Sequence, residues 1–367
     1  MKDVFKQLKE EVAKSGMVPT METMPRRTLQ DKRIGGPTAA HVIEEIHTPL
    51  NFAYVTFTTG SSAFQNIVGI TFPELDDRKQ AAMKVFQMAG VPKGAKVLVT
   101  YPPLVNVFSA AAFAEQELDC HFLVRSNKEA FISALHEVQP QVIVGESTFI
   151  KKTLYEAKDM GLVEGMPKHV ILLTAGTPLD LDLLPVAHEV LQGQVHDLFG
   201  CQEFGWICID GVPVRDDVSL VQAPETARKD YFEVVVGGLP TGDTFPVLES
   251  GHVCNPKGKI LTYQRERSYP EYEVIVKATT LDSKETIGRV ARTILRIKGR
   301  IVKISPEVVL GADHTVLEMM PEYLSGAPMV GQVIEGKEKT KLFDDLVKAQ
   351  VDYQERRKED STWVKRR

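Results

Sequence analysis

A cluster of hydroxyl side chains follows the first β-branched run of the chain, in the segment YVTFTTGSSAFQNIVGIT at residues 54–71. The cluster consists of Thr58, Thr59, Gly60, Ser61 and Ser62. Hydroxyl and backbone N–H donors around a flexible glycine can surround phosphate oxygens. The same composition is typical of an ordinary turn, and the glycine and lysine spacing of a nucleoside-triphosphatase P-loop is missing. A phosphate site and a plain turn therefore both remain open from these residues alone.

A second segment, VHDLFGCQEFGWICIDG at residues 195–211, places acidic and amide side chains in a glycine-bracketed loop after a strand. The polar residues there are Asp197, Gln202 and Glu203. Ligands of α/β sheets collect outside the carboxyl ends of the strands, so a carboxylate there could hold a divalent cation against phosphates. A solvated loop glutamate is the alternative interpretation.

A third segment, HVILLTAGTPLDLDLL at residues 169–184, is a strand that ends in the small residues Ala175 and Gly176. Small side chains let a flat ring approach the backbone closely. The segment therefore predicts a place where a planar ligand could lie against the chain.

The elements around these segments predict an α/β fold. Between about residues 53 and 200, short β-branched runs alternate with helical stretches, which implies parallel crossovers and a doubly wound sheet. Gly90 and Pro92 mark the end of a helix predicted at residues 76–90. After about residue 206, alternating strands with turn signals predict a small β-rich subdomain, and a charged amphipathic helix follows Lys337.

These patterns predict three parts: an α/β core at residues 1–205, a β-rich subdomain at 206–300, and a short C-terminal remnant at 301–367. Within the remnant, the apolar positions Leu342, Leu346, Ala349 and Tyr353 recur at helical spacing. A helix packed by one stripe and a helix that docks a partner both fit that spacing.

Composition excludes several classes of protein. With 43% hydrophobic and 25% charged residues, the chain is typical of a globular protein, and no apolar run is long enough to cross a bilayer. A net charge of -5 provides no basic surplus for nucleic acid. The four cysteines form no metal or redox spacing, so we expect free thiols, a cytoplasmic location, and neither a membrane nor a nucleic-acid partner.

Taken in order, the three segments resemble the adenylate-forming superfamily of acyl-CoA synthetases, and most closely its phenylacetate-CoA-ligase-like branch of aryl acid activators. TTGSSAFQNIVGIT is similar to the loop that folds over ATP phosphates, AGTPL to the Gly-x-Pro segment along the adenine, and FGCQE to the aromatic-Gly-x-Ser/Thr-Glu motif. The resemblance covers roughly residues 50–300. It implies an acyl-CoA-synthetase-like N-terminal domain with doubly wound mixed sheets, and an AMP-forming ligase that uses ATP and Mg²⁺.

The resemblance also assigns roles to residues of this sequence. Those expected at the nucleotide are Thr58, Thr59, Gly60, Ser61, Ser62, Ala175, Gly176, Pro178, Asp197, Phe199, Gly200 and Arg300. Gln202 and Glu203 are the expected catalytic residues, with Glu203 as the Mg²⁺ ligand. The acid is expected beside Tyr101, Gly145, Phe204 and Gly205. The apolar and aromatic surroundings there favour a flat aromatic acid.

Several positions depart from the family pattern. Phe64 stands where the phosphate loop normally carries a lysine, and Gln202 stands where Ser or Thr is usual. The ribose-binding aspartate has two rival counterparts, Thr293 and Asp243. No catalytic lysine can be assigned, because too few residues follow Arg300 for the usual C-terminal domain. The missing lysine predicts weaker ATP binding or slower chemistry.

The sequence therefore predicts ATP-dependent adenylation of an aromatic carboxylate. Similarity to compact superfamily members of phenazine antibiotic biosynthesis implies phenazine dicarboxylate as the acid and a reductase as the partner that receives the aryl adenylate. The alternatives are an aryl-CoA ligase that forms a thioester with coenzyme A, and a degenerate protein that binds an aryl acid without converting it. A homodimer is compatible with all three.

Overall fold

The computed structural model describes residues 2–13, 52–57, 67–100, 103–123, 127–222, 231–254, 266–267, 272–288, 290, 301–321 and 331–359. The chain divides into two compact units, each of which is built from separate stretches of sequence. Unit 1 comprises Met1–Arg26, Asp77–Arg215 and Phe245–Arg265. Unit 2 comprises Arg27–Asp76, Asp216–Thr244 and Glu266–Arg367.

Unit 1 is built on a seven-stranded sheet with the strand order β4-β3-β5-β6-β7-β8-β9. Its strands are β3 (Lys96–Val99), β4 (Asp119–Phe122), β5 (Val142–Gly145), β6 (Ile171–Thr174), β7 (Gln194–Cys201), β8 (Gly205–Ile209) and β9 (Val212–Pro213). The strands β3 to β7 pair in parallel, and β8 and β9 add antiparallel pairs. Because β4 and β5 flank β3 on opposite sides, the strand order reverses between β3 and β5.

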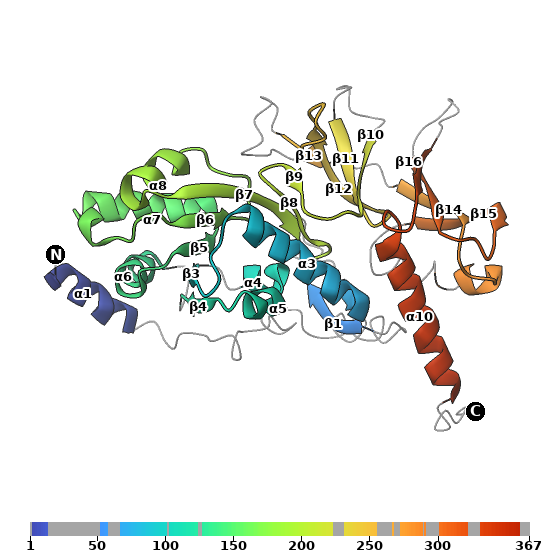
Figure 1. The fold of residues 1–367 in the computed structure, drawn as a ribbon, viewed down its shortest axis with the longest axis horizontal. Coiled ribbons are helices and arrows are strands. Elements are labelled where there is room, and N and C mark those ends of the chain that lie inside the picture. The colour runs from blue at the N-terminus through green and yellow to red at the C-terminus, as the bar shows by residue number, and fades with distance from the viewer. Residues whose placement is uncertain are drawn as a thin grey trace, which may run out of the picture. The chain divides into compact units, whose positions relative to one another are not determined.

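Helices cover both faces of this sheet (Figure 1). One apolar cluster joins the sheet to α3 (Phe72–Met88), α4 (Pro103–Phe108) and α5 (Ala110–Glu115). The other joins it to α6 (Lys128–Val138), α7 (Ser147–Asp159), α8 (Leu183–Leu191) and α1 (Lys2–Ala13), and the 3-10 turn η1 (Val163–Gly165) follows α7. Alternate residues of each strand face opposite clusters, as Leu98 and Val99 do. The predicted doubly wound α/β fold is therefore confirmed.

Local sequence explains where α3 begins and ends. Thr71 N donates to Glu74 Oε2 over 2.8 Å, which is the carboxylate half of a capping box. At the other end Gly90 has φ of +69°, and Val91 N donates to Phe86 O over 2.8 Å, as in a Schellman motif. The helix end predicted at Gly90 is confirmed, whereas the start lies four residues before the predicted residue 76.

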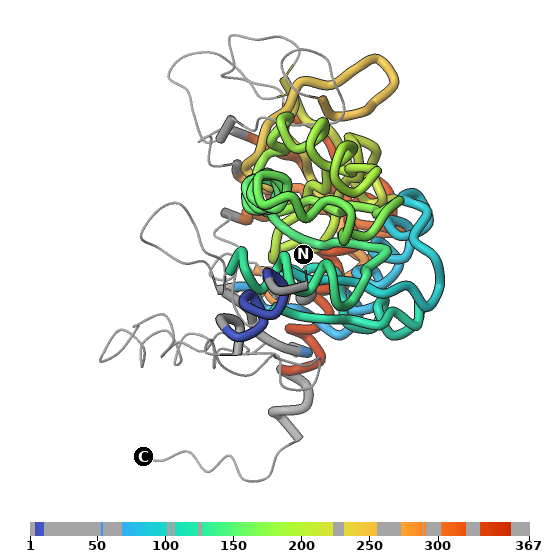
Figure 2. The backbone as a smooth tube through the Cα atoms, turned by 90° about the vertical axis from the view of Figure 1, so that its left-hand side faces the viewer, coloured from blue at the N-terminus to red at the C-terminus, as the bar shows by residue number. Residues whose placement is uncertain are grey.

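The first helix of the chain packs on unit 1. In Figures 1 and 2, α1 in blue lies beside α6, and the Phe5 and His136 rings stack with centroids 3.7 Å apart. Phe5 and Leu8, one turn apart, are both buried. Among the described helices, none is long and apolar enough to span a membrane.

Unit 2 is rich in β-structure, as the sequence predicts. Its strands are β1 (Phe52–Phe57), β2 (Ile67–Thr71), β10 (Val218–Gln222), β11 (Tyr231–Val236), β12 (Leu239–Pro246, which ends in unit 1), β13 (Glu266–Arg267), β14 (Tyr272–Ala278), β15 (Ile301–Val309), β16 (Val316–Pro321) and β17 (Gln332–Glu335). They form an antiparallel β1-β2 hairpin and two four-stranded sheets, β10-β11-β12-β13 and β15-β14-β16-β17.

The C-terminal helix α10 (Lys341–Glu359) contacts β2 and buries one stripe of side chains. Leu342, Leu346 and Ala349 are buried and Tyr353 is half-buried, so the predicted apolar stripe is confirmed. At the start of the helix, Phe343 N donates to the carbonyl of Gly237, in the β11–β12 turn, over 3.0 Å. The beginning of α10 is therefore fastened directly to a turn of the β-rich unit.

Asp344, in the first turn of α10, is a partly buried carboxylate. It accepts hydrogen bonds from Thr315 Oγ1 (2.6 Å) and Thr340 Oγ1 (3.0 Å), yet burial raises its pKa above the usual value. Protonation is therefore favoured in the folded state, and this stabilisation is lost as pH rises through the folded pKa. We expect Asp344→Asn to gain urea resistance relative to the wild type on going from pH 5 to pH 7.

The matched control for that measurement is Asp352→Asn, two turns further along α10. Its urea midpoint should follow the wild type at both pH values. If Asp344→Asn instead loses stability more strongly at pH 7 than at pH 5, the charged carboxylate is the favoured form and burial does not dominate its pKa.

Candidate functional site

Four residues form a row across the carboxyl ends of the parallel strands in unit 1. Gly145 is the register partner of Thr174, which is the partner of Asp197, and Thr100 N bonds the carbonyl that precedes Gly145. A Cβ atom on Gly145 would lie 2.0 Å from Thr100 Oγ1, so a larger residue here would require Thr100 to move. The row begins where the strand order reverses, between β3 and β5, which is where α/β sheets usually bind ligands.

The hairpin turn between β7 and β8 carries Gln202 and Glu203, both half-buried. The buried guanidinium of Arg78 donates to the carbonyls of Gln202 (2.9 Å) and Glu203 (2.8 Å). Arg215 donates to the carbonyl of Phe204 over 2.8 Å. Two arginines therefore hold the turn through its backbone carbonyls.

Glycines allow this turn to close. A Cβ atom on Gly200 would lie 2.5 Å from Gly205 O, and Gly205 itself has φ of +74°. The ring of Phe199 is buried and meets Phe245 edge-on, with centroids 4.8 Å apart. Phe204 is also buried, so both rings contribute to the packing beneath the turn.

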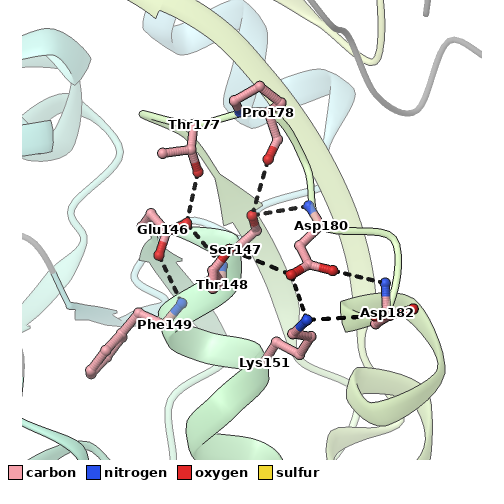
Figure 3. A network of polar contacts seen from close by, with 9 residues as sticks. All are labelled: Glu146, Ser147, Thr148, Phe149, Lys151, Thr177, Pro178, Asp180 and Asp182. Atoms are coloured by element: carbon pink, nitrogen blue, oxygen red, sulfur yellow. Dashed lines mark hydrogen bonds and ion pairs between the residues drawn. The ribbon is translucent and has the colours of Figure 1, made fainter. Parts of the chain in front are cut away.

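The segment after β6 becomes exposed two residues past the end of the strand. Ala175 is buried, whereas Gly176, Thr177 and Pro178 are exposed, and Gly176 has φ of +94°. Thr177 Oγ1 donates to Glu146 Oε1 over 2.7 Å (Figure 3). This segment is thus fixed by the neighbouring βα junction after β5.

The structure brings together Gly145, Ala175, Gly176, Pro178, Asp197, Phe199, Gly200, Gln202, Glu203, Phe204 and Gly205, all at or beyond the carboxyl ends of β5, β6 and β7. The remaining predicted site residues lie outside the described residues; they are Thr58, Thr59, Gly60, Ser61, Ser62, Tyr101 and Arg300. The role of each residue stays a prediction.

Glu203 is the predicted ligand of a magnesium ion that would arrive with a nucleotide. Within the described part of the chain, no three His, Cys, Asp or Glu side chains gather into a metal site. Mg²⁺ commonly keeps several waters and takes only one or two protein carboxylates together with substrate phosphates. A single half-buried carboxylate on a held turn suits that mode of binding, and bound Mg²⁺ would offset charge on the phosphates.

All four cysteines are free thiols, as predicted. Burial, followed by the charge of Asp119, raises the pKa of Cys120 to about 12. Burial, followed by the charge of Asp197, raises the pKa of Cys208 well above its usual range, and burial also raises the pKa of Cys254. Since the thiolate is the nucleophilic form, these three thiols are unsuited to covalent catalysis at neutral pH.

Sequence reasoning missed three residues of this region: Arg78, Glu146 and Lys151. Glu146 caps the N-terminus of α7 by accepting from Thr148 N and Phe149 N. The usual N-cap residues are Ser, Thr, Asp and Asn, so a glutamate at this position gives no N-cap signal in the sequence. No local signal identifies Arg78, because its two acceptors lie 124 and 125 positions away.

A family model described as the MadH C-terminal domain matches residues 210–354. A curated relative from Malonomonas rubra, named ACP-SH:acetate ligase, is 54% identical over 369 residues, and the alignment covers 100% of both chains. The chain belongs to the family of this ligase. The prediction of a ligase is thereby confirmed, whereas the relationship to phenazine-pathway members stays a prediction.

Solved structures similar to this chain include the N-terminal domain of FACL13 from Mycobacterium tuberculosis, at a TM-score of 0.45 and 12% identity, with 58% of this chain and 60% of that chain covered. O-succinylbenzoate coenzyme A synthetase from Bacillus subtilis, in complex with AMP, matches at a TM-score of 0.44 and 15% identity, with 59% and 61% covered. This similarity is partial, and the chain spans about 60% of the length of these proteins.

Proposed function

We propose that this ligase joins acetate to the thiol of an acyl carrier protein, with ATP as the energy source and acetyl-adenylate as the intermediate. The observation that carries the proposal is the 54% identity to the M. rubra ACP-SH:acetate ligase along the entire chain. A relationship that extends over both units favours a shared reaction over a shared fold alone.

The reaction takes place in two balanced steps. A carboxylate oxygen of acetate attacks the α-phosphorus of ATP, and pyrophosphate leaves. The carrier thiol then loses its proton to solvent and attacks the acetyl carbon, which forms the thioester and releases AMP. Such displacements need mainly positioning and charge stabilisation from the protein.

Two side chains at the β7–β8 turn suit the first step. Glu203 would hold magnesium against the phosphates, and the Gln202 amide would donate to an α-phosphate oxygen. Arg78 holds the backbone of both residues, which supports a preorganised turn. The hydroxyls of Thr58, Thr59, Ser61 and Ser62, outside the described residues, complete the proposed phosphate site.

The raised thiol pKa values of Cys120, Cys208 and Cys254 support direct transfer to the carrier. An acetyl-cysteine intermediate on this protein would need a thiolate that these burial-raised pKa values disfavour. The carrier thiol is then the nucleophile of the second step.

Packing near the proposed acid site supports a small acid. Phe108 and Trp206 are both fully buried, with ring centroids 4.3 Å apart. Phe86 and Phe113 pack on Phe108 from the other sides, with centroids 5.7 and 5.6 Å away. Because these rings are buried against one another, they offer no exposed face on which a flat acid could stack, and acetate needs none.

An aromatic acid, including phenazine dicarboxylate, with a reductase as acceptor, remains the second candidate because of the motif resemblance described above. Coenzyme A as the acceptor and a non-catalytic acid-binding protein are the further alternatives. Phe64, in place of the usual phosphate-loop lysine, is the feature that favours the last of these.

The test is exchange of labelled pyrophosphate into ATP, driven by acetate, propionate, benzoate or phenazine dicarboxylate at equal concentration. We expect acetate to give the fastest exchange, and acetyl thioester to form with acyl carrier protein but not with coenzyme A. If only the aromatic acids drive exchange, the substrate is an aromatic acid and not acetate. If thioester forms only on coenzyme A, the acceptor is coenzyme A and not the carrier protein. If no acid in the panel drives exchange, the proposed enzyme activity is contradicted.

A further inference from the structure

The segment at residues 175–182 is held by the first turns of α7 through a continuous polar network (Figure 3). All members of this network belong to unit 1. The network joins the chain after β5 to the chain after β6, two strands that are neighbours in the sheet. It therefore fixes two adjacent βα junctions relative to each other.

Glu146 is the centre of the network's upper part. Its Oε1 accepts from Thr148 N at 2.9 Å and from Thr177 Oγ1 at 2.7 Å, while its Oε2 accepts from Phe149 N at 2.7 Å. The carboxylate thus satisfies two of the N–H groups that a helix N-terminus leaves without internal partners. Because its negative charge already lies at this helix end, the N-terminus of α7 is a poor site for phosphate.

A second set of contacts, which we call the Lys151 anchor, lies one turn further along α7. Lys151 Nζ is 2.6 Å from Asp180 Oδ2 and 3.5 Å from Asp182 Oδ2. Asp180 N also donates to Ser147 Oγ over 3.1 Å. The hydrogen bond from Lys151 is the main cause that lowers the pKa of Asp180, so this anchor is fully charged at neutral pH.

Gly176 lies between Ala175, which continues β6, and Thr177, which bonds Glu146. It is exposed and has φ of +94°. Its predecessor Ala175 is buried and continues the hydrogen bonding of β6, since Ala175 N donates to Gly145 O over 3.0 Å. The exposed stretch is thus fixed on one side by the sheet and on the other by Thr177. Because both neighbours of this glycine are held by hydrogen bonds, the segment is preorganised, and a ligand that binds to it does not have to order it.

We infer that Glu146 and Thr177 are positioning residues for nucleotide binding: their hydrogen bond sets the conformation of residues 175–178, the segment that the motif resemblance assigns to the adenine. The inference rests on the proposed function, which places a nucleotide at this edge of the sheet. Neither residue acts on the reacting atoms. Removing their hydrogen bond weakens nucleotide binding and leaves the chemistry and the acid site unchanged.

Thr177→Val is the sharpest variant, because valine keeps the shape and removes only the hydroxyl. A hydrogen bond to a charged carboxylate predicts about a tenfold rise in KM for ATP and in the Kd for AMP measured by titration calorimetry. The kcat and the KM for acetate should stay within about twofold of the wild type. Thr177→Ser keeps a hydroxyl and should restore wild-type nucleotide binding.

Glu146→Gln and the double variant Glu146→Gln/Thr177→Val complete a cycle. The two losses in AMP affinity should be clearly less than additive, because they remove the same hydrogen bond. Thr153→Val is the matched control: its hydroxyl donates to Phe149 O within α7, 2.9 Å away, and does not reach residues 175–178. That variant should bind AMP as the wild type does.

Three outcomes would overturn the inference. If the wild type binds AMP and exchanges pyrophosphate, and Thr177→Val binds AMP equally well, the inference is wrong and the proposed function is unaffected. If kcat and the melting temperature fall and both KM values rise together, the substitution has caused general structural damage. A wild type that neither binds AMP nor exchanges pyrophosphate removes the proposed function, and the inference with it.

Discussion

Glu203→Gln should lower acetate-driven pyrophosphate exchange by at least about a hundredfold, the usual scale for removing one preorganised electrostatic contact. Glutamine has the same shape but lacks the charge that would hold Mg²⁺ against the phosphates. The backbone of the turn should not move, because the hydrogen bond from Arg78 to the carbonyl of residue 203 does not depend on the side chain that is changed. The measurements are exchange rate over a range of Mg²⁺ concentrations and acetate binding by calorimetry.

Acetate binding should survive in Glu203→Gln, which separates a lost metal ligand from a collapsed site. Glu249→Gln, at an exposed glutamate of unit 1, is the control and should exchange at the wild-type rate. If Glu203→Gln retains normal exchange, the metal is held elsewhere and the proposed role of Glu203 is wrong. Partial recovery at high Mg²⁺ would support the assignment.

Gly237→Ala should have the largest effect on stability. Gly237 has φ of +57°, and an added Cβ atom would lie 2.2 Å from Leu342 Cβ and 2.8 Å from Leu342 N. Left-handed backbone costs alanine about 1–2 kcal/mol, and the collision must also push α10 away from the turn. We expect a total loss on the order of 3–5 kcal/mol in the free energy of unfolding, measured by urea titration with circular dichroism.

Gly161→Ala is the matched control for that experiment. Gly161 follows α7 with φ of +69°, and an added Cβ atom there would meet nothing within 4 Å. This variant should show only the conformational cost of about 1 kcal/mol. Equal losses in the two variants would mean that contact between the turn and α10 adds nothing, and that the helix is not closely packed on Gly237 in solution.

The alternation of strands and helices in unit 1 could be predicted from sequence, because each buried strand is a short apolar run between helical stretches. The position of Glu203 at the carboxyl end of β7 could also be predicted, since the strand and its turn are contiguous in sequence. The contacts that hold this turn could not. Arg78 bonds it across 124 positions, and no periodicity encodes such a partner.

The substrate was the least accessible feature. Aromatic residues around Tyr101–Phe108 predicted an aromatic ligand, but Phe108 packs against Trp206 and so contributes to the core. Whether an aromatic side chain lines a cavity or fills it depends on residues distant in sequence. The aromatic acid and the domain limits after residues 205 and 300 therefore stay predictions, whereas the family is settled by the full-length relative.

The contact between β2 and α10 joins two elements that are synthesised far apart in time. Thr71 ends β2 and Lys341 begins α10, a separation of 341 − 71 = 270 residues. At about 5–20 residues per second, the ribosome needs roughly 15–50 s to make that stretch. During this interval β2, whose side chains Val68 and Ile70 are buried in the folded protein, lacks its contact with α10. Newly made chains that stop short of the last helix would be the natural targets of chaperones and proteases.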